Sequence, residues 1–233
     1  MFKTDLSFPS ADPPSFVYGV YPDLGMLDPI SDPAIPLNDK PAAFTSWASG
    51  YYAPISSTSH ITPDALCNRT EEGTPTVHAL SSTDFTRIVQ SDVVFRSGGL
   101  ILQTSPEIHA RHTRCAFLDA DAVLPDVEIV ALWCDRSMWM TVWGARALEE
   151  LLREEPGAGK RKRPTSLVKL ENANHFVSNP YAHGALESKW SVSLIGTSQR
   201  RLCKFCATLY SPDQASRLQV TLTPQAPNYR GPL

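Results

Sequence analysis

The feature that most constrains the fold is a strand–helix–strand pattern between residues 127 and 170. Residues 127–133 (VEIVALW) are almost continuously apolar, which is typical of a parallel strand covered on both faces. Residues 139–155 then predict an amphipathic helix that Pro156-Gly157 ends, and residues 165–170 predict a second strand. Because strands joined through a helix form right-handed parallel crossovers, we expect an α/β fold. The predicted buried stripe of the helix comprises Val142, Ala145, Leu148, Leu151 and Leu152, with Glu149 and Arg153 spaced for an i,i+4 pair.

The second strand ends in a loop that presents a histidine. Glu171-Asn172-Ala173-Asn174 interrupts the β-formers, and His175 follows directly. Open α/β sheets place their chemistry beyond the carboxyl ends of their parallel strands, so His175 is a candidate functional residue. The alternative is a loop histidine that only satisfies local hydrogen bonds.

The composition limits the class of protein. A chain of 233 residues can form one substantial core, and one domain is the default. The net charge of −3 provides no field that would recruit nucleic acid or an acidic membrane surface. There is no run of about eighteen apolar residues and no signal-peptide core at the start. Five cysteines without regular spacing suit a reducing compartment, so we predict a cytoplasmic protein.

The segment before residue 121 divides into a strand and a helical region. Residues 1–18 predict a sheet strand and turn, in which Pro9 confines the strand to an edge and Asp12 stands at its carboxyl end. Residues 19–120 predict a mainly helical cap or lid, with helices over 41–52, 59–68, 82–89 (capped by Ser82) and within 105–118. Such caps shape a substrate pocket and exclude water during reaction. The alternative, that these helices pack directly on the sheet, stays open.

Residues 121–177, with Asn172-Ala173-Asn174-His175-Phe176 at their end, resemble the last two strand units of an α/β-hydrolase. The resemblance is stronger over 126–177 and extends more weakly over 5–177. It implies a partial hydrolase-like parallel sheet and cleavage of an ester, epoxide or related bond by a nucleophile, histidine and acid, with His175 as the base. The family's nucleophile elbow, G-x-S-x-G, does not occur, since no two glycines lie four positions apart. By the family's chain order the nucleophile and the oxyanion loop would precede residue 1.

The position of the acid is open. The resemblance places it about where Ser137 stands, and a serine there would simply cap a helix beginning at Met138. Asp135 lies in the same turn, two residues away, whereas Asp12 ends the preceding sheet strand, a position that some members of the family use. We favour Asp12 because it requires no change in the turn, although an aspartate before Pro-Pro is also a typical turn former.

Residues 178–233 predict an irregular tail with weak periodicity. A single C-x-x-C at Cys203 and Cys206 is a poor zinc site, so no metal is expected. We hypothesise that this tail is non-native read-through of an intron, because Val177-Ser178 can be encoded as a splice donor and the hydrolase pattern stops there. Native peptides that map across 178–233 would contradict this hypothesis.

Three function classes follow. The first is a hydrolase whose chain as given is inactive alone, since the nucleophile is missing, and is poorly soluble because a sheet edge is unpaired. The second is a non-catalytic protein that binds a small apolar ligand. The third is a nucleic-acid protein that uses the basic residues 160–163 and 200–201. No organic cofactor is implied, and the oligomeric state is open. The aromatic side chains that would line an apolar pocket in the first two classes are Phe44, Trp47, Tyr51, Trp139 and Trp143.

Overall fold

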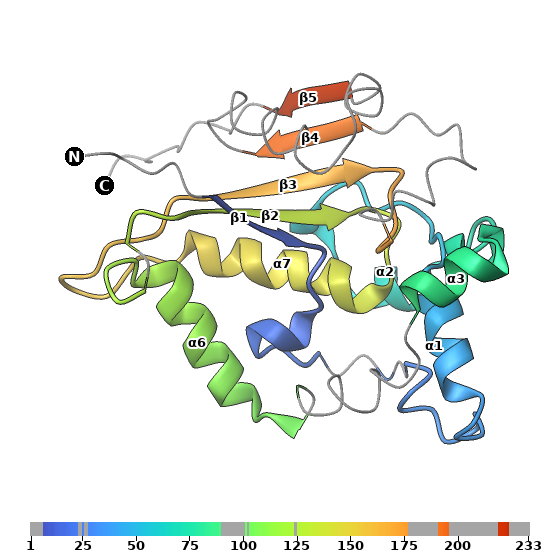
Figure 1. Ribbon diagram of the computed structural model, residues 1–233. Coiled ribbons are helices and arrows are strands. Elements are labelled where there is room, and N and C mark those ends of the chain that lie inside the picture. The colour runs from blue at the N-terminus through green and yellow to red at the C-terminus, as the bar shows by residue number, and fades with distance from the viewer. Residues whose placement is uncertain are drawn as a thin grey trace.

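The computed structural model describes residues 7–22, 25, 28–89, 101, 103–123, 125–176, 191–195 and 219–223, with 7–11, 191–195 and 219–223 described by their backbone. Five strands form one sheet in the order β1-β2-β3-β4-β5 (Figure 1). They are β1 (Ser7–Ala11), β2 (Glu128–Cys134), β3 (Thr165–Glu171), β4 (Ser191–Ile195) and β5 (Gln219–Thr223). β1, β2 and β3 are parallel, β4 runs antiparallel to β3, and β5 is parallel to β4. The fold is therefore mixed α/β, as the sequence predicted.

β1 occupies one end of the strand order, where its proline is tolerated. Pro9 pairs in register with Val130 of β2. A proline has no N–H to donate to a second neighbouring strand, which is why the sequence predicted an edge position. Among the described strands β1 is therefore an edge strand, and it ends at Ala11, directly before Asp12.

β4 and β5 lie within the segment for which the sequence predicted an irregular tail. That prediction is wrong for 191–195 and 219–223, because both stretches pair along their full length in the sheet. Each of them, SVSLI and QVTLT, alternates polar and β-branched or aliphatic residues, which is the two-residue period of a strand. Cys203, Cys206 and residues 200–201 lie outside the described residues, and the intron hypothesis stays a prediction.

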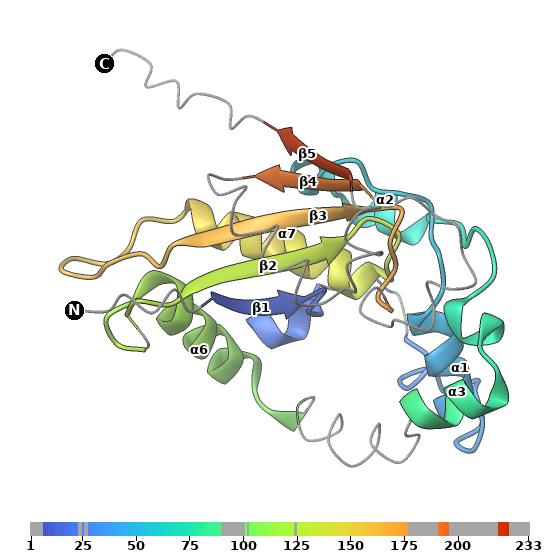
Figure 2. The ribbon, with the colours of Figure 1, turned by 45° about the horizontal axis from the view of Figure 1, so that its top comes forward.

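Two helices cover the same face of the parallel strands (Figures 1 and 2). α6 (Pro106–Leu118) lies on the connection from β1 to β2, and α7 (Trp139–Arg153) is the connection from β2 to β3. Right-handed crossovers between strands in sequential order place both helices on one side. A core cluster joins them to the sheet and consists of Phe117, Leu118, Ala131, Trp133, Ala145, Leu148 and Leu167. Glu149 and Arg153 form the predicted i,i+4 pair at 2.6 Å.

The α-helices between residues 40 and 88 gather beyond the carboxyl ends of β1, β2 and β3 (Figure 1). The 3-10 turns that begin at Ser15 and Thr58 instead pack against the helical layer, the first against α6 and α7 and the second against α7. The short 3-10 helix η1 (Ser15–Tyr18) follows β1 directly, and η2 (Thr58–His60) and η3 (Thr76–Ala79) are further 3-10 turns. The α-helices are α1 (Lys40–Ala48), α2 (Pro63–Cys67) and α3 (Ser82–Ile88). Part of the expected cap region, 19–120, therefore lies at the strand ends, while α6 belongs to the helical layer on the sheet. Ser81, and not the predicted Ser82, caps α3, because its Oγ accepts from the N–H of Asp84 at 3.1 Å.

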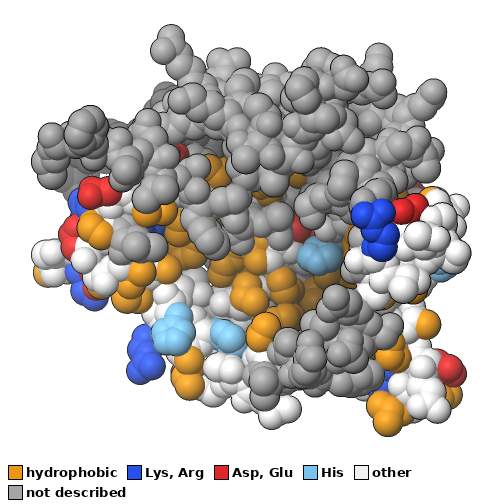
Figure 3. Space-filling view, in the orientation of Figure 1, with side chains coloured by type: hydrophobic (Ala, Val, Ile, Leu, Met, Phe, Trp, Pro, Cys, Tyr) orange, Lys and Arg blue, Asp and Glu red, His pale blue; other side chains and the backbone are white. Residues whose placement is uncertain are grey.

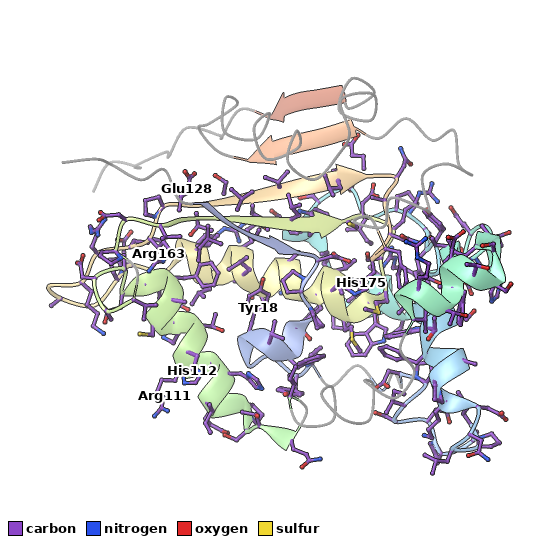
Figure 4. All side chains as sticks on the ribbon, in the orientation of Figure 1. Tyr18, Arg111, His112, Glu128, Arg163 and His175 are labelled. Carbon is purple, nitrogen blue, oxygen red and sulfur yellow. The ribbon has the colours of Figure 1, made fainter. Side chains whose placement is uncertain are left out.

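The basic side chains of residues 160–163 form ion pairs and hydrogen bonds with other parts of the chain. Lys160 and Arg161 form ion pairs with Asp119 and Asp121, at 2.7 and 2.9 Å. Arg163 is only 4% exposed and donates to backbone carbonyls between residues 116 and 127 (Figure 4). These contacts tie the loop after α6 to the loop before β3, so the run has a structural role. Among the described helices, none combines the length and the apolar character needed to cross a membrane.

Candidate active site

Asp12 stands where β1 ends and is almost completely buried, at 1% exposure. Its backbone adopts a left-handed conformation, with φ of 47°, which aspartate tolerates better than most residues. Its N–H donates to the carbonyl of Leu132 at 2.8 Å, and its Oδ1 accepts from the N–H of Cys134 at 3.0 Å. The turn is thereby held to the carboxyl end of β2, and the side chain is aimed across the strand ends.

His175 meets this carboxylate from the loop after β3. Its Nδ1 lies 3.1 Å from Oδ2 of Asp12, and its side chain is 31% exposed (Figure 4). Because an ionised carboxylate accepts and cannot donate, the contact assigns the proton to Nδ1 and leaves Nε2 as the acceptor nitrogen. The structure therefore brings together the two residues that the sequence had singled out.

Ser137 contacts the same carboxylate, and the prediction that it caps a helix from Met138 is wrong. α7 begins at Trp139, its N-cap is Met138, and no side chain caps it. Ser137 is fully buried and its Oγ donates to Oδ2 of Asp12 at 2.5 Å. The hydroxyl is directed to the acid because the turn 134–137 faces the end of β1, which the local sequence does not reveal.

Asp135, the other carboxylate considered for the acid, is held in a different environment. It is 5% exposed, and its Oδ1 has no hydrogen-bond partner. Burial raises the pKa of Asp135 to about 6, against opposing contributions from the Lys169 cation and the N–H of Asn172. The neighbouring Cys134 is not a candidate nucleophile. Burial raises the pKa of its thiol well above the ordinary value, and the thiolate is the reactive form of cysteine.

The histidine loop is fixed by a buried asparagine. Asn174 is 2% exposed, and its Nδ2 donates to the carbonyl of Ser49 at 2.6 Å and to Oγ1 of Thr76 at 2.8 Å. Its Oδ1 accepts from the N–H of Phe176 at 3.0 Å. Since both donor contacts reach the segment between α1 and η3, that segment holds His175 in place.

A half-buried arginine, Arg69, fixes the turn 135–137 on the other side of the site. Arg69 donates through Nε to the carbonyl of Ala53 at 2.9 Å, and through its two terminal nitrogens to the carbonyls of Ser137 and Asp135, at 2.6 and 2.9 Å. Burial lowers the pKa of Arg69 to about 10, partly offset by the charge of Asp135, so the guanidinium remains charged at neutral pH. The helical region at the strand ends is thus bonded directly to both sides of the Asp12–His175 contact.

Half-buried apolar side chains lie beside the histidine. Phe176, whose ring centroid is 6.2 Å from that of His175, belongs to a cluster with Ala48, Met138 and Met140 at its centre. Figure 3 shows hydrophobic side chains gathered on this face, in the part of the view where Figure 4 labels His175. The other half-buried members of the cluster are Phe16, Phe44, Trp47, Tyr52 and Trp139. Trp143 belongs to a second cluster, centred on Ile61, Leu66 and Val142, which shares Trp139 with the first.

Fold and site together define an acid–histidine pair at the carboxyl ends of parallel strands, with an apolar surface beside it. No protein-family model matches the chain, and no curated protein or solved structure matches it either. Within the described part of the chain, no group of three or more histidine, cysteine, aspartate or glutamate side chains is arranged to hold a metal ion.

Sequence reasoning missed the residues that hold the pair in place: Ser137 as a partner of Asp12, Asn174 and Arg69. One signal for Asn174 was present, because an asparagine next to a candidate histidine in a short loop is suited to bond backbone groups. No local signal identified Arg69, whose partners lie up to 68 residues away.

Proposed function

We propose that this chain carries the acid and the base of an α/β-hydrolase-like catalytic unit that cleaves an ester, epoxide or related bond. His175 is the general base and Asp12 is its acid. The observation that carries the proposal is the 3.1 Å contact between Nδ1 of His175 and Oδ2 of Asp12. It leaves Nε2 free to take a proton from a nucleophile, while the buried carboxylate stabilises the imidazolium that forms.

The arrangement of elements supports this assignment. Asp12 follows β1 and His175 follows β3, and the parallel register of β1, β2 and β3 brings these ends to one edge. Both connecting helices lie on one face of the sheet, as in the strand units that the sequence resembles (Figure 2). Asp12, at the end of β1, is the position that some α/β-hydrolases use for the acid and the one that the sequence analysis favoured.

The nucleophile is placed outside these 233 residues, because the sequence contains no G-x-S-x-G elbow. Removing a nucleophile from such a mechanism leaves only a small residual catalysis. The proposal therefore expects the chain as given to be inactive alone. The half-buried cluster around Phe176 favours a small apolar substrate, because aromatic and aliphatic side chains would bury its non-reacting part.

The test is a full-length read of the native transcript, followed by labelling of the encoded protein with a fluorophosphonate probe. We expect an upstream strand followed by small-x-Ser/Asp-x-small. If the nucleophile is a serine, the probe labels it, and labelling is lost in His175→Ala. If it is an aspartate, epoxide hydrolysis replaces labelling as the readout. A transcript that starts at Met1 and runs unchanged through Leu233 would overturn the enzymatic proposal.

The second candidate function is non-catalytic binding of a small apolar ligand on the same scaffold. The apolar cluster favours it without requiring a nucleophile. Binding of a fluorescent apolar probe such as anilinonaphthalene sulfonate separates the two candidates. A binder retains its affinity in His175→Ala, loses affinity in Trp47→Ala, and is not labelled by the fluorophosphonate.

A further inference from the structure

Two hydrogen bonds converge on one oxygen of Asp12. Oδ2 accepts from Oγ of Ser137 at 2.5 Å and lies 3.1 Å from Nδ1 of His175, while Oδ1 accepts from the N–H of Cys134. A carboxylate that is 1% exposed has little access to water, so these donors provide its solvation. Both oxygens are held, and the plane of the carboxylate is therefore fixed from two directions.

The donor from Ser137 is itself held rigidly. Its side chain is fully buried, its N–H donates to the carbonyl of Cys134 at 3.3 Å, and its carbonyl accepts from the Arg69 guanidinium at 2.6 Å. The hydroxyl has no exposure with which to act as a nucleophile. The same hydroxyl donates to the acid and is also a side-chain hydrogen-bond partner of the buried Cys134 thiol.

We propose that Ser137 is a positioning residue that fixes the Asp12 carboxylate and thereby keeps His175 in the Nδ1–H tautomer. Its role in a reaction rests on the proposed function, whereas its effect on the histidine does not. Without the hydroxyl, Oδ2 loses one of two donors and the carboxylate turns about its side-chain bonds to recover hydrogen bonds. The acceptor for Nδ1–H is then misaligned, and the Nε2–H tautomer, which cannot act as a base toward a nucleophile, becomes populated.

The experiment records long-range ¹H–¹⁵N spectra of the imidazole nitrogens in the full 233-residue chain. It is carried out at about pH 8, where an ordinary imidazole is neutral. In the wild type we expect a protonated-type Nδ1 shift and an unprotonated-type Nε2 shift for His175. In Ser137→Ala both shifts move toward the average of the two tautomers, and Asp12→Asn abolishes the preference. Ser137→Cys, which keeps a weaker donor of similar size, falls between wild type and Ser137→Ala.

Thr141→Val is the matched control. Thr141 is 1% exposed and its Oγ1 donates to the carbonyl of Met138 at 3.0 Å, so the change removes a nearby buried hydroxyl without touching Asp12. It should leave the His175 shifts unchanged. Circular dichroism establishes that each variant is folded, and if Ser137→Ala does not fold, Ser137→Cys carries the test.

The outcomes separate this inference from the proposed function. Unchanged His175 shifts in a folded Ser137→Ala or Ser137→Cys overturn the positioning role and leave the proposed function standing. Shifts that move as expected, together with absence of hydrolytic activity in the extended protein, keep the positioning role and overturn the proposed function. In an active extended protein, Ser137→Ala should lower kcat about tenfold or more at little change in KM, as expected for loss of a charge-assisted hydrogen bond.

Discussion

Asp135 should make the fold less stable at neutral pH than at mildly acidic pH. Its carboxyl group is 5% exposed and has one oxygen without a partner, and burial raises its pKa from the ordinary 3.8 to about 6. Between these two values the folded chain retains a proton that the unfolded chain has released. The contribution of Asp135 to the free energy of unfolding therefore falls as the pH rises from about 4 to about 6 and reaches a plateau above that range.

The magnitude follows from the pKa difference. At about 1.4 kcal/mol per pKa unit, the rise corresponds to roughly 3 kcal/mol in total, of which about 2–3 kcal/mol falls between pH 4 and pH 7. Asp135→Asn replaces the carboxyl group with a neutral one of the same shape and removes this pH-dependent loss. We expect the stability of the variant relative to wild type to rise by about 2–3 kcal/mol from pH 4 to pH 7.

The assay is urea denaturation followed by tryptophan fluorescence at a series of pH values. Taking the difference between variant and wild type cancels the titration of groups that do not interact with Asp135. Asp126→Asn, which makes the same substitution at an exposed position, is the matched comparison. A difference for Asp135→Asn that stays constant within about 0.5 kcal/mol across the range would refute the reasoning.

Three further substitutions test the packing around the site. Asn174→Ala should lower the free energy of unfolding by about 2–4 kcal/mol in urea denaturation, because two buried donor contacts are lost, and should make the chain more sensitive to proteolysis in the histidine loop. Gly144→Ala should destabilise by about 1–3 kcal/mol despite alanine's better helix propensity. The reason is that the added Cβ would lie 2.6 Å from the carbonyl oxygen of Pro13, and the melting temperature measures the effect. Arg69→Met should cost about 1.5–3 kcal/mol in the same denaturation assay, because three part-buried carbonyls lose a charged donor.

Two of these changes have a control that makes the same chemical change elsewhere. Gly157→Ala adds a Cβ whose nearest neighbour is 3.7 Å away, so it should be tolerated. Arg114→Met removes an exposed ion pair with Glu154 and should cost less than about 1 kcal/mol. If Gly144→Ala were as stable as wild type, the close packing of α7 on the turn after Asp12 would be contradicted. Equal losses of unfolding free energy for Arg69→Met and Arg114→Met would contradict the stabilisation of the 135–137 turn by Arg69.

Local sequence patterns predicted much of the fold. The apolar run of β2 and the stripe of α7 follow from periodicity, and Pro9 placed β1 at an edge because proline lacks a ladder donor. The observed helix ends differ from the predicted ones by a few residues. The helix predicted over 41–52, for example, corresponds to α1, which ends at Ala48. The alternating stretches of β4 and β5 carried a strand signal, but each is only five residues long and stands in a proline-rich, otherwise weakly periodic region.

The sequence by itself determined that a histidine would leave the end of a parallel strand and that Asp12, Asp135 and Ser137 were the groups to consider beside it. Only the tertiary structure decided among them. Asp12 and His175 are 163 positions apart, and no local preference encodes a contact over that distance. The register of three parallel strands brings their carboxyl ends to one edge, so Ser137 and His175 both contact Asp12 there, while the carboxyl group of Asp135 is held in a different environment. Local hydrogen bonds and side-chain periodicity act over a few residues, and the site depends on strand pairing across the whole described sheet.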